Sequence, residues 1–177
     1  MPRAVTPKGF GAPLGMYSHG MVAPAGDVVV VAGQVGIGPD GQVAVDNVLA
    51  QTKQALENVR AIVEAAGCTM RDVVRLQTFL TRAEDIPGFM KARSEVFPGY
   101  FPDGVYPPNT LLVVSRLVRP ELLIEIEAMA LKSKEAAAPA RPPGGPAPSA
   151  TAPRKDQLRR PSRRSKPGRA SRARRHR

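Results

Sequence analysis

The sequence predicts an α+β domain with the element order ββαβαββ and both helices on one face of the sheet. Apolar residues recur with a period of two in some segments and a period near 3.6 in others, and these segments alternate along the chain. With 177 residues, of which 42% are hydrophobic, the chain is large enough for one ordinary core. We therefore expect one folded domain over residues 1–133.

The first two strands are predicted at residues 17–22 and 28–31. The second is a run of four valines followed by an Ala-Gly pair, a pattern typical of a buried strand. Between them, residues 23–26 have the sequence Ala-Pro-Ala-Gly, which favours a turn. The two strands are therefore expected to pair as a hairpin.

The first helix is predicted between a cap at Asp46 or Asn47 and a stop at Gly67. Its apolar stripe has helical spacing and consists of Val48, Thr52, Ala55, Leu56, Val59, Ile62, Val63 and Ala66. A strand is expected next, near residues 73–81, and then a second helix at about residues 85–96.

Two further strands are predicted near residues 110–117 and 121–131. In the last one, the period of two places Leu122, Ile124, Ile126, Ala128 and Ala130 on one face, and Leu123, Glu125, Glu127 and Met129 on the other. Two carboxylates thus share a face with apolar neighbours. Either they protect a solvated sheet face from edge pairing, or one lies in a partly dry cleft, where its pKa rises and it can hold a water or move a proton.

Residues 134–177 have a different composition. They hold 14 of the 26 Lys and Arg residues, and Ala, Pro, Arg and Gly dominate the segment. Such a segment cannot bury enough apolar surface to offset the entropy lost on ordering. We expect a disordered basic tail, so the net charge of +11 is a property of the tail and not of the domain.

Several classes of protein are excluded by composition. The longest apolar run has five residues, whereas a membrane helix needs about 20, and the first residues lack the apolar stretch of a secretory signal. We expect no membrane partner and a cytoplasmic location. The single cysteine forms no internal disulfide, and the two histidines provide no metal-binding spacing, so neither a structural metal nor another cofactor is expected.

Five short motifs support a more specific interpretation. They are Gly15-Met16-Tyr17-Ser18-His19-Gly20, Val31-Ala32-Gly33-Gln34-Val35, Leu56-Glu57-Asn58-Val59 with Ala65-Ala66-Gly67, Asp72-Val73-Val74-Arg75 leading into Phe79-Leu80-Thr81, and Glu125-Ile126-Glu127-Ala128. Over residues 13–132 the sequence resembles the Rid family, the reactive-intermediate deaminases also called YjgF-like proteins. The resemblance implies a chorismate-mutase-like fold and a homotrimer with clefts between adjacent subunits. It also implies metal-free hydrolysis of small imines or enamines to a carbonyl compound and ammonia.

The resemblance also implies two catalytic residues. Glu125 matches the glutamate that positions water in active members, and Tyr17 matches the tyrosine that lines the cleft. His19 is expected to share a face with Tyr17, which makes it a base, a ligand contact or a packing residue at the rim.

The substrate-binding positions match the family only in part. Asn109 stands where active members have an arginine that binds the substrate carboxylate, and Leu111 stands where they have a cysteine. Ala32, beside Gly33, replaces a frequent serine, and Met90 replaces an asparagine. A bidentate contact from arginine to a carboxylate contributes about 1.5–3 kcal/mol, which a neutral amide cannot supply. We therefore expect poor turnover of 2-imino acids and a neutral or weakly polar ligand.

The sequence thus predicts a homotrimer that binds a small imine, enamine or carbonyl metabolite in a cleft between subunits and hydrolyses it. One alternative is a trimer that binds a ligand without catalysis. Another is a nucleic-acid-associated protein that acts through the tail. Because no Phe, Tyr or Trp follows Tyr106, such binding would be nonspecific, weak and strongly salt-dependent.

Overall fold

The computed structural model describes residues 1–134. Its strands are β1 (Arg3–Val5), β2 (Gly20–Val22), β3 (Gly26–Val35), β4 (Val73–Leu80), β5 (Asn109–Val113) and β6 (Ile124–Ser133). Its helices are α1 (Val48–Ala65) and α2 (Ile86–Tyr100), with short 3-10 turns at Met70–Asp72 and Ala83–Asp85. The predicted α+β class is confirmed. The expected tail falls on residues that the structure does not describe, apart from its first residue, and stays a prediction.

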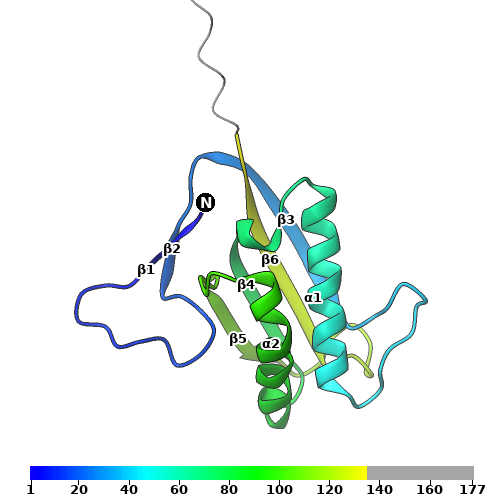
Figure 1. The fold of residues 1–177 in the computed structure, drawn as a ribbon. Coiled ribbons are helices and arrows are strands. Elements are labelled where there is room, and N and C mark those ends of the chain that lie inside the picture. The colour runs from blue at the N-terminus through cyan, green and yellow to red at the C-terminus, as the bar shows by residue number, and fades with distance from the viewer. Residues whose placement is uncertain (135–177) are drawn as a thin grey trace, which may run out of the picture. The chain divides into compact units, whose positions relative to one another are not determined.

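Four strands form one sheet in the order β3-β6-β4-β5 (Figure 1). β4 and β5 run parallel, and the other neighbours are antiparallel. α1 packs against β3 and β6, and Figure 1 shows α2 in front of β4 and β5. Both helices therefore cover the same face, as predicted. We call this the helix face, and we call the opposite side of the sheet the open face.

The core lies between the helices and the sheet, and β6 shows how the sequence builds it. Ile124, Ile126, Ala128 and Ala130 are buried, whereas Glu125 and Met129 are half-buried and Glu127 is exposed. This is the predicted alternation from Ile124 onward. Leu122 and Leu123, predicted on opposite faces, precede the strand and are both buried. The core also contains Leu56, Val59 and Val63 of α1, Leu76 and Leu80 of β4, and Phe89 and Phe97 of α2.

The ends of α1 also follow the sequence. The side chain of Asn47 accepts a hydrogen bond from the backbone N–H of Ala50 at 3.0 Å, so Asn47 rather than Asp46 is the cap. Gly67 adopts a φ of 78°, and the N–H of Cys68 returns to the carbonyl of Val63 at 2.9 Å. This left-handed glycine satisfies the last carbonyls of the helix.

The predicted hairpin at the N-terminus is wrong. β2 pairs with β1, and β3 pairs along its length with β6. Tyr17 and His19 consequently lie in a loop before β2 rather than in a strand. The alternation of apolar and polar residues shows which side chains share a face of a strand, but it does not specify the partner strand. In addition, β1 has only three residues, which are too few to show a period of two.

The valines of β3 are also less buried than expected. Val31 is buried against the helices, but Val28 and Val30 point to the open face and are 56% and 72% exposed. The strand is thus covered on one face only within this chain. α2 differs as well, since it continues four residues beyond the predicted end, through Pro98 to Tyr100.

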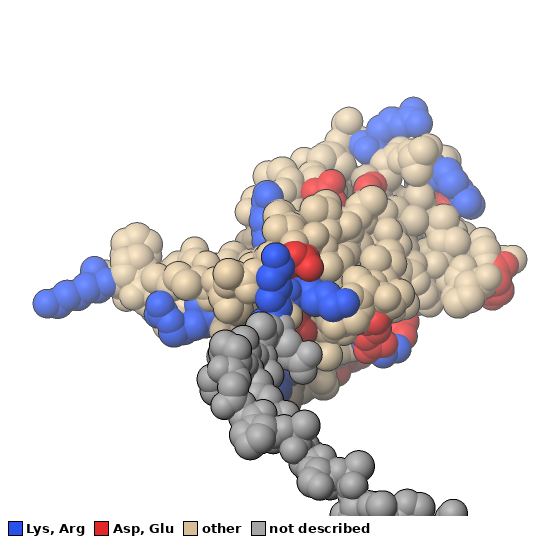
Figure 2. Space-filling model, turned by 90° about the horizontal axis from the view of Figure 1, so that it is seen from above, with Lys and Arg blue, Asp and Glu red and all other residues tan. Residues whose placement is uncertain are grey.

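Charged side chains are distributed without a dominant sign over the described part. Figure 2 shows basic and acidic groups scattered between large uncharged areas on the face that is seen. This agrees with a domain close to neutral. Among residues 1–134, neither helix has the length and apolar composition needed to cross a membrane.

Candidate functional site

Glu125 and Gly33 lie side by side on neighbouring strands. In β6, Glu125 pairs with Phe79 of β4 and Val35 of β3, and its side chain lies on the open face. The β3–β6 register shifts between Val31 and Gln34, and Gly33 lies in that bulge. A Cβ atom added at Gly33 would lie 2.5 Å from Cδ and 2.8 Å from Cγ of Glu125. The bulge and the missing side chain therefore make room for the carboxylate.

The Glu125 carboxylate has no partner among the described residues and is available to bind a ligand or a water molecule. Glu125 is half-buried, and within residues 1–134 it forms no ion pair and no side-chain hydrogen bond. Ala32 is exposed next to Gly33. A carboxylate beside open backbone and without a cation has free lone pairs, so it can accept hydrogen bonds from a water molecule.

Asn109 and Leu111 lie on the other side of the sheet. In the parallel register they stand opposite Leu76 and Thr78 of β4, whose side chains are buried beneath the helices. The Thr78 hydroxyl donates to Oδ1 of Asn109 at 3.0 Å. This contact uses the acceptor of the amide, so the two N–H groups of Asn109 remain as donors. Leu111 packs against the core.

Met90 belongs to the same side of the molecule as Asn109. It lies on α2 and is 44% exposed, so its thioether points away from the core. An exposed methionine on a helix offers a flexible apolar contact to whatever lies beside it.

Tyr17 and His19 lie in a loop formed by residues 6–19. Their rings meet edge to face with centroids 6.0 Å apart. The Tyr17 hydroxyl accepts a hydrogen bond from the N–H of Leu14 at 3.4 Å, and His19 Nε2 lies 3.0 Å from the carbonyl of Gly11. Tyr17 and His19 were expected to share one face of a strand. Their side chains do lie together, but they do so because they pack within a loop.

One chain therefore holds the predicted residues in three groups. Glu125, Ala32 and Gly33 lie at the open face, Asn109, Leu111 and Met90 lie on the helix side, and Tyr17 and His19 lie in the loop. Because the sheet separates Glu125 from Asn109, a single subunit does not bring them to one substrate.

Two residues of this region were missed by the sequence analysis. Thr78 orients Asn109, and Arg93 of α2 donates to the carbonyl of Met16 beside Tyr17. Arg93 left a signal in the sequence, because it falls in the apolar stripe of α2 with Phe89, Ala92 and Phe97. A cation at a core position of a helix is unusual and requires an explanation.

The open face also carries a shallow hollow of about 240 Å³. Its lining residues include Val30, Ala32, Arg75, Gln77, Glu127 and Met129. Arg75 donates to Gln77, two residues further along β4. Ala32 is the one predicted site residue that it shares.

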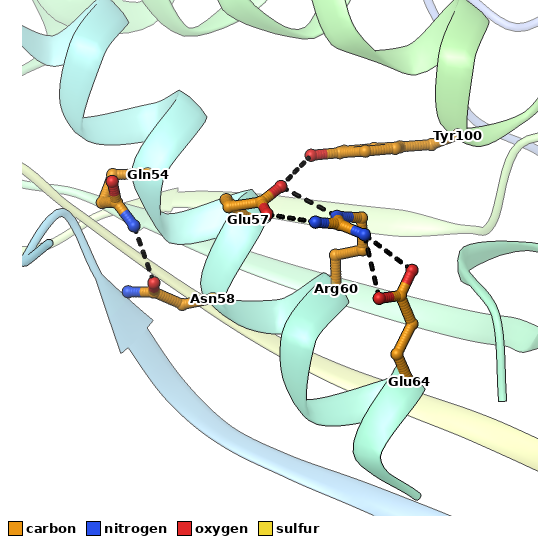
Figure 3. A network of polar contacts seen from close by, with 6 residues as sticks. All are labelled: Gln54, Glu57, Asn58, Arg60, Glu64 and Tyr100. Carbon is orange, nitrogen blue, oxygen red and sulfur yellow. Dashed lines mark hydrogen bonds and ion pairs between the residues drawn. The ribbon is translucent and has the colours of Figure 1, made fainter. Parts of the chain in front are cut away.

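A separate polar cluster lies on the outer surface of the helices (Figure 3). Arg60 bridges two carboxylates of α1, donating to Glu57 Oε2 at 2.8 Å and to Glu64 Oε1 at 2.8 Å. The hydroxyl of Tyr100, from α2, also donates to Glu57, at 3.2 Å. Arg60 lowers the pKa of the Glu57 carboxyl, and burial together with Glu57 raises the pKa of Tyr100 to about 12. The cluster contains none of the predicted site residues.

Comparisons with known proteins agree with this fold. Residues 10–132 match the model of the Endoribonuclease L-PSP family. A RutC family protein from Pyrococcus horikoshii is 39% identical over 121 residues, which cover 68% of this chain and 90% of that protein. A 2-iminobutanoate/2-iminopropanoate deaminase from Salmonella typhimurium is 31% identical over 132 residues, or 75% of this chain and 99% of the enzyme.

A solved structure shows the same arrangement of elements. The Rid family protein YyfB from Yersinia pestis superimposes with a TM-score of 0.64 and 31% identity, over 74% of this chain and 98% of that one. The match to the family model ends at residue 132.

Proposed function

This chain belongs to the Rid family, also known as YjgF/RutC, and on that basis we propose that it is an imine or enamine hydrolase acting in the cytoplasm. The substrate is a small reactive imine or enamine, or a carbonyl compound related to it, bound in a cleft between two subunits of a homotrimer. The products are a carbonyl compound and ammonia.

One observation carries the proposal: the half-buried Glu125 carboxylate rests against Gly33 with its lone pairs free of any ion pair in the described chain. Hydrolysis of a C=N bond requires a water molecule to be held next to the carbon and its proton to be moved to nitrogen. Glu125 accepts the proton as the water oxygen bonds to carbon, and returns it to the nitrogen. This gives a carbinolamine. Glu125 then moves a second proton from the new hydroxyl to the nitrogen, the C–N bond breaks as the carbonyl forms, and ammonia leaves.

Two further residues complete the proposed site. Asn109, oriented by Thr78, donates its amide N–H groups to an oxygen or nitrogen of the substrate. Tyr17 orients the substrate from the loop. The separation of Glu125 and Asn109 by the sheet supports a cleft shared by adjacent subunits, since only a second copy can supply the missing half.

The residue at position 109 also bears on the charge of the substrate. The relative from Salmonella typhimurium is named for 2-imino acids, which carry a carboxylate. A neutral amide contributes less to binding a carboxylate than a bidentate arginine does, by a factor of about 10 to 150. We therefore propose that this protein prefers uncharged imines.

Ammonia release from two matched substrates tests the proposal. We would compare freshly generated 2-iminopropanoate with its amide analogue, which has the same skeleton without the charge, and use Glu125→Gln as the inactive control. Faster hydrolysis of the amide by the native protein, lost in Glu125→Gln while the melting temperature stays the same, is the expected result. Equal activity of Glu125→Gln would refute its role, and no activity with either substrate would favour a protein that binds its ligand without catalysis.

A second function is favoured by the charge of residues 134–177, which hold 14 of the 26 Lys and Arg residues. We propose that this segment binds polynucleotides electrostatically and without sequence preference. Three copies on a trimer would add avidity. Removing residues 134–177 should abolish retention on immobilised polynucleotide at low salt. Unchanged retention would assign the binding to residues 1–133 instead.

A further inference from the structure

The loop formed by residues 6–19, here called the N-terminal loop, has hydrogen bonds and ring contacts of its own, and its residue Met16 also packs against the core. The N–H of Phe10 bonds to the carbonyl of Pro7 at 3.1 Å, and the rings of Phe10 and His19 meet edge to face at 5.3 Å. Leu14, at its tip, is 98% exposed. A compact loop of this kind has a defined internal shape, but its position depends on how it is attached to the domain.

Only two hydrogen bonds attach the N-terminal loop to residues 20–134 in the described chain. The Ser18 hydroxyl donates to the carbonyl of Tyr106 at 2.5 Å, and Arg93 donates to the carbonyl of Met16. Met16 and Ser18 are the two neighbours of Tyr17 in the sequence. The attachment therefore acts where it fixes the backbone of the proposed catalytic tyrosine.

Arg93 is an unusual group to find at this place. It is 2% exposed, and its guanidinium lies over the rings of Phe97, 4.4 Å from the centroid, and Phe89, at 5.2 Å. Within residues 1–134 it forms no ion pair with a carboxylate, and its Nε has no hydrogen-bond acceptor. Burial lowers its pKa to about 10, so the group is still cationic at neutral pH.

A buried cation without a carboxylate partner has a desolvation cost that no ion pair offsets. Contribution to stability is therefore a poor explanation for Arg93. Its aromatic neighbours hold the guanidinium plane by cation–π contact, which leaves the hydrogen bond to Met16 as its specific interaction.

We infer that Arg93 is a positioning residue that fixes Tyr17 by holding the carbonyl of Met16 and, with it, the N-terminal loop against α2. The effect of Arg93 on hydrolysis rests on the proposed function, because it requires the proposed role of Tyr17. The attachment of the loop by Arg93 does not depend on that function. Arg93 does not touch the substrate; it acts through Tyr17.

Hydrogen exchange tests the attachment without any assumption about activity. The full chain would be compared with Arg93→Met, which keeps an apolar side chain of similar length but removes the donors, and with Arg93→Lys, which keeps the charge. Lys91→Met, exposed on the same helix, is the matched control. Because hydrogen bonds from a charged donor are worth about 10- to 150-fold in an equilibrium, we expect amides of residues 9–19 to exchange at least about 10-fold faster in Arg93→Met.

The same experiment distinguishes attachment from general stability. Peptides from α1 and β6 should exchange at the native rate in Arg93→Met, and Arg93→Lys should restore part of the protection in the loop. Unchanged exchange in residues 9–19 would overturn the inference, and so would faster exchange throughout the domain.

A double-mutant cycle tests whether Arg93 acts through Tyr17. Arg93→Met should lower kcat/KM for the amide analogue about 10-fold in the native background and have little effect in Tyr17→Phe. Additive effects would show that Arg93 works independently of Tyr17. A loss confined to 2-iminopropanoate would show that Arg93 binds the substrate carboxylate directly, which contradicts a positioning role. If the native protein hydrolyses neither substrate, the proposed function fails while hydrogen exchange still decides the attachment.

Discussion

Gly33 lies against the carboxylate of Glu125, with room for a hydrogen atom but not for a methyl group. The two residues are 92 positions apart in the sequence and come together because β3 and β6 are neighbours in the sheet. Glu125 is the residue proposed to hold the water molecule. Its side chain can take this position because residue 33 has no Cβ atom.

The first prediction concerns Gly33→Ala. The added Cβ would displace the Glu125 side chain, so hydrolysis should be lost. Because only a flexible, half-buried side chain has to move, the free energy of unfolding should change little. Ammonia release and urea unfolding measure the two effects. Gly99→Ala is the matched control, since a Cβ there meets no atom within 4 Å. Full activity of Gly33→Ala would mean that the position of the Glu125 side chain does not matter.

The second prediction concerns Asn109→Arg. An arginine restores the fork that binds a carboxylate, so hydrolysis of 2-iminopropanoate should improve by about 10- to 150-fold in KM. Asn109→Lys supplies charge without the fork and should improve KM less. Steady-state ammonia release from both variants gives the comparison. If the native protein already has a low KM for 2-iminopropanoate, another group binds the carboxylate.

The third prediction concerns a cleft shared between subunits. Glu125→Gln and Asn109→Leu should each reduce activity, and mixing the two variants through unfolding and refolding should restore it. In a randomly mixed cyclic trimer about one quarter of the clefts would combine an intact Glu125 with an intact Asn109. Activity of the mixture relative to each variant alone is the measurement. A mixture no more active than its components would indicate that both residues serve a cleft within one subunit.

The fourth prediction concerns Tyr100 and alkaline pH. Burial and the neighbouring Glu57 raise the pKa of Tyr100 to about 12, above the usual value near 10. Between these values the native state holds a proton that the unfolded chain releases, so stability should fall as pH rises from about 10 to 12. Ultraviolet titration of tyrosinate should show one late step.

Two variants check the assignment of that step. Tyr100→Phe should remove it, and Glu57→Gln should move it to lower pH by removing the charge that opposes tyrosinate. A late step that persists in Tyr100→Phe would belong to another of the three tyrosines.

The sequence was sufficient for features that depend on neighbours along the chain. The period of two in β6 correctly separated Glu125 from Ile124 and Ile126. Capping preferences limited the start of α1 to Asp46 or Asn47 and placed its end at Gly67. These features follow from local backbone geometry, which a few consecutive residues determine.

Contacts between residues far apart in the sequence could not be predicted from local patterns. Arg93 meets Met16 across 77 positions, and Thr78 meets Asn109 across 31. No periodic pattern encodes which strand lies beside which, and for that reason the partner of β2 was predicted incorrectly. The family resemblance gave the proposed site residues, and the strand register showed that they are divided between the two sides of the sheet.

The exposed valines of β3 have a consequence for how this protein should behave at different concentrations. Val28 and Val30 leave apolar area in contact with water in an isolated chain, and association of chains through this face would remove it. The proposed assembly would then stabilise the fold by mass action. The melting temperature should therefore rise with protein concentration, and highly diluted samples should unfold first.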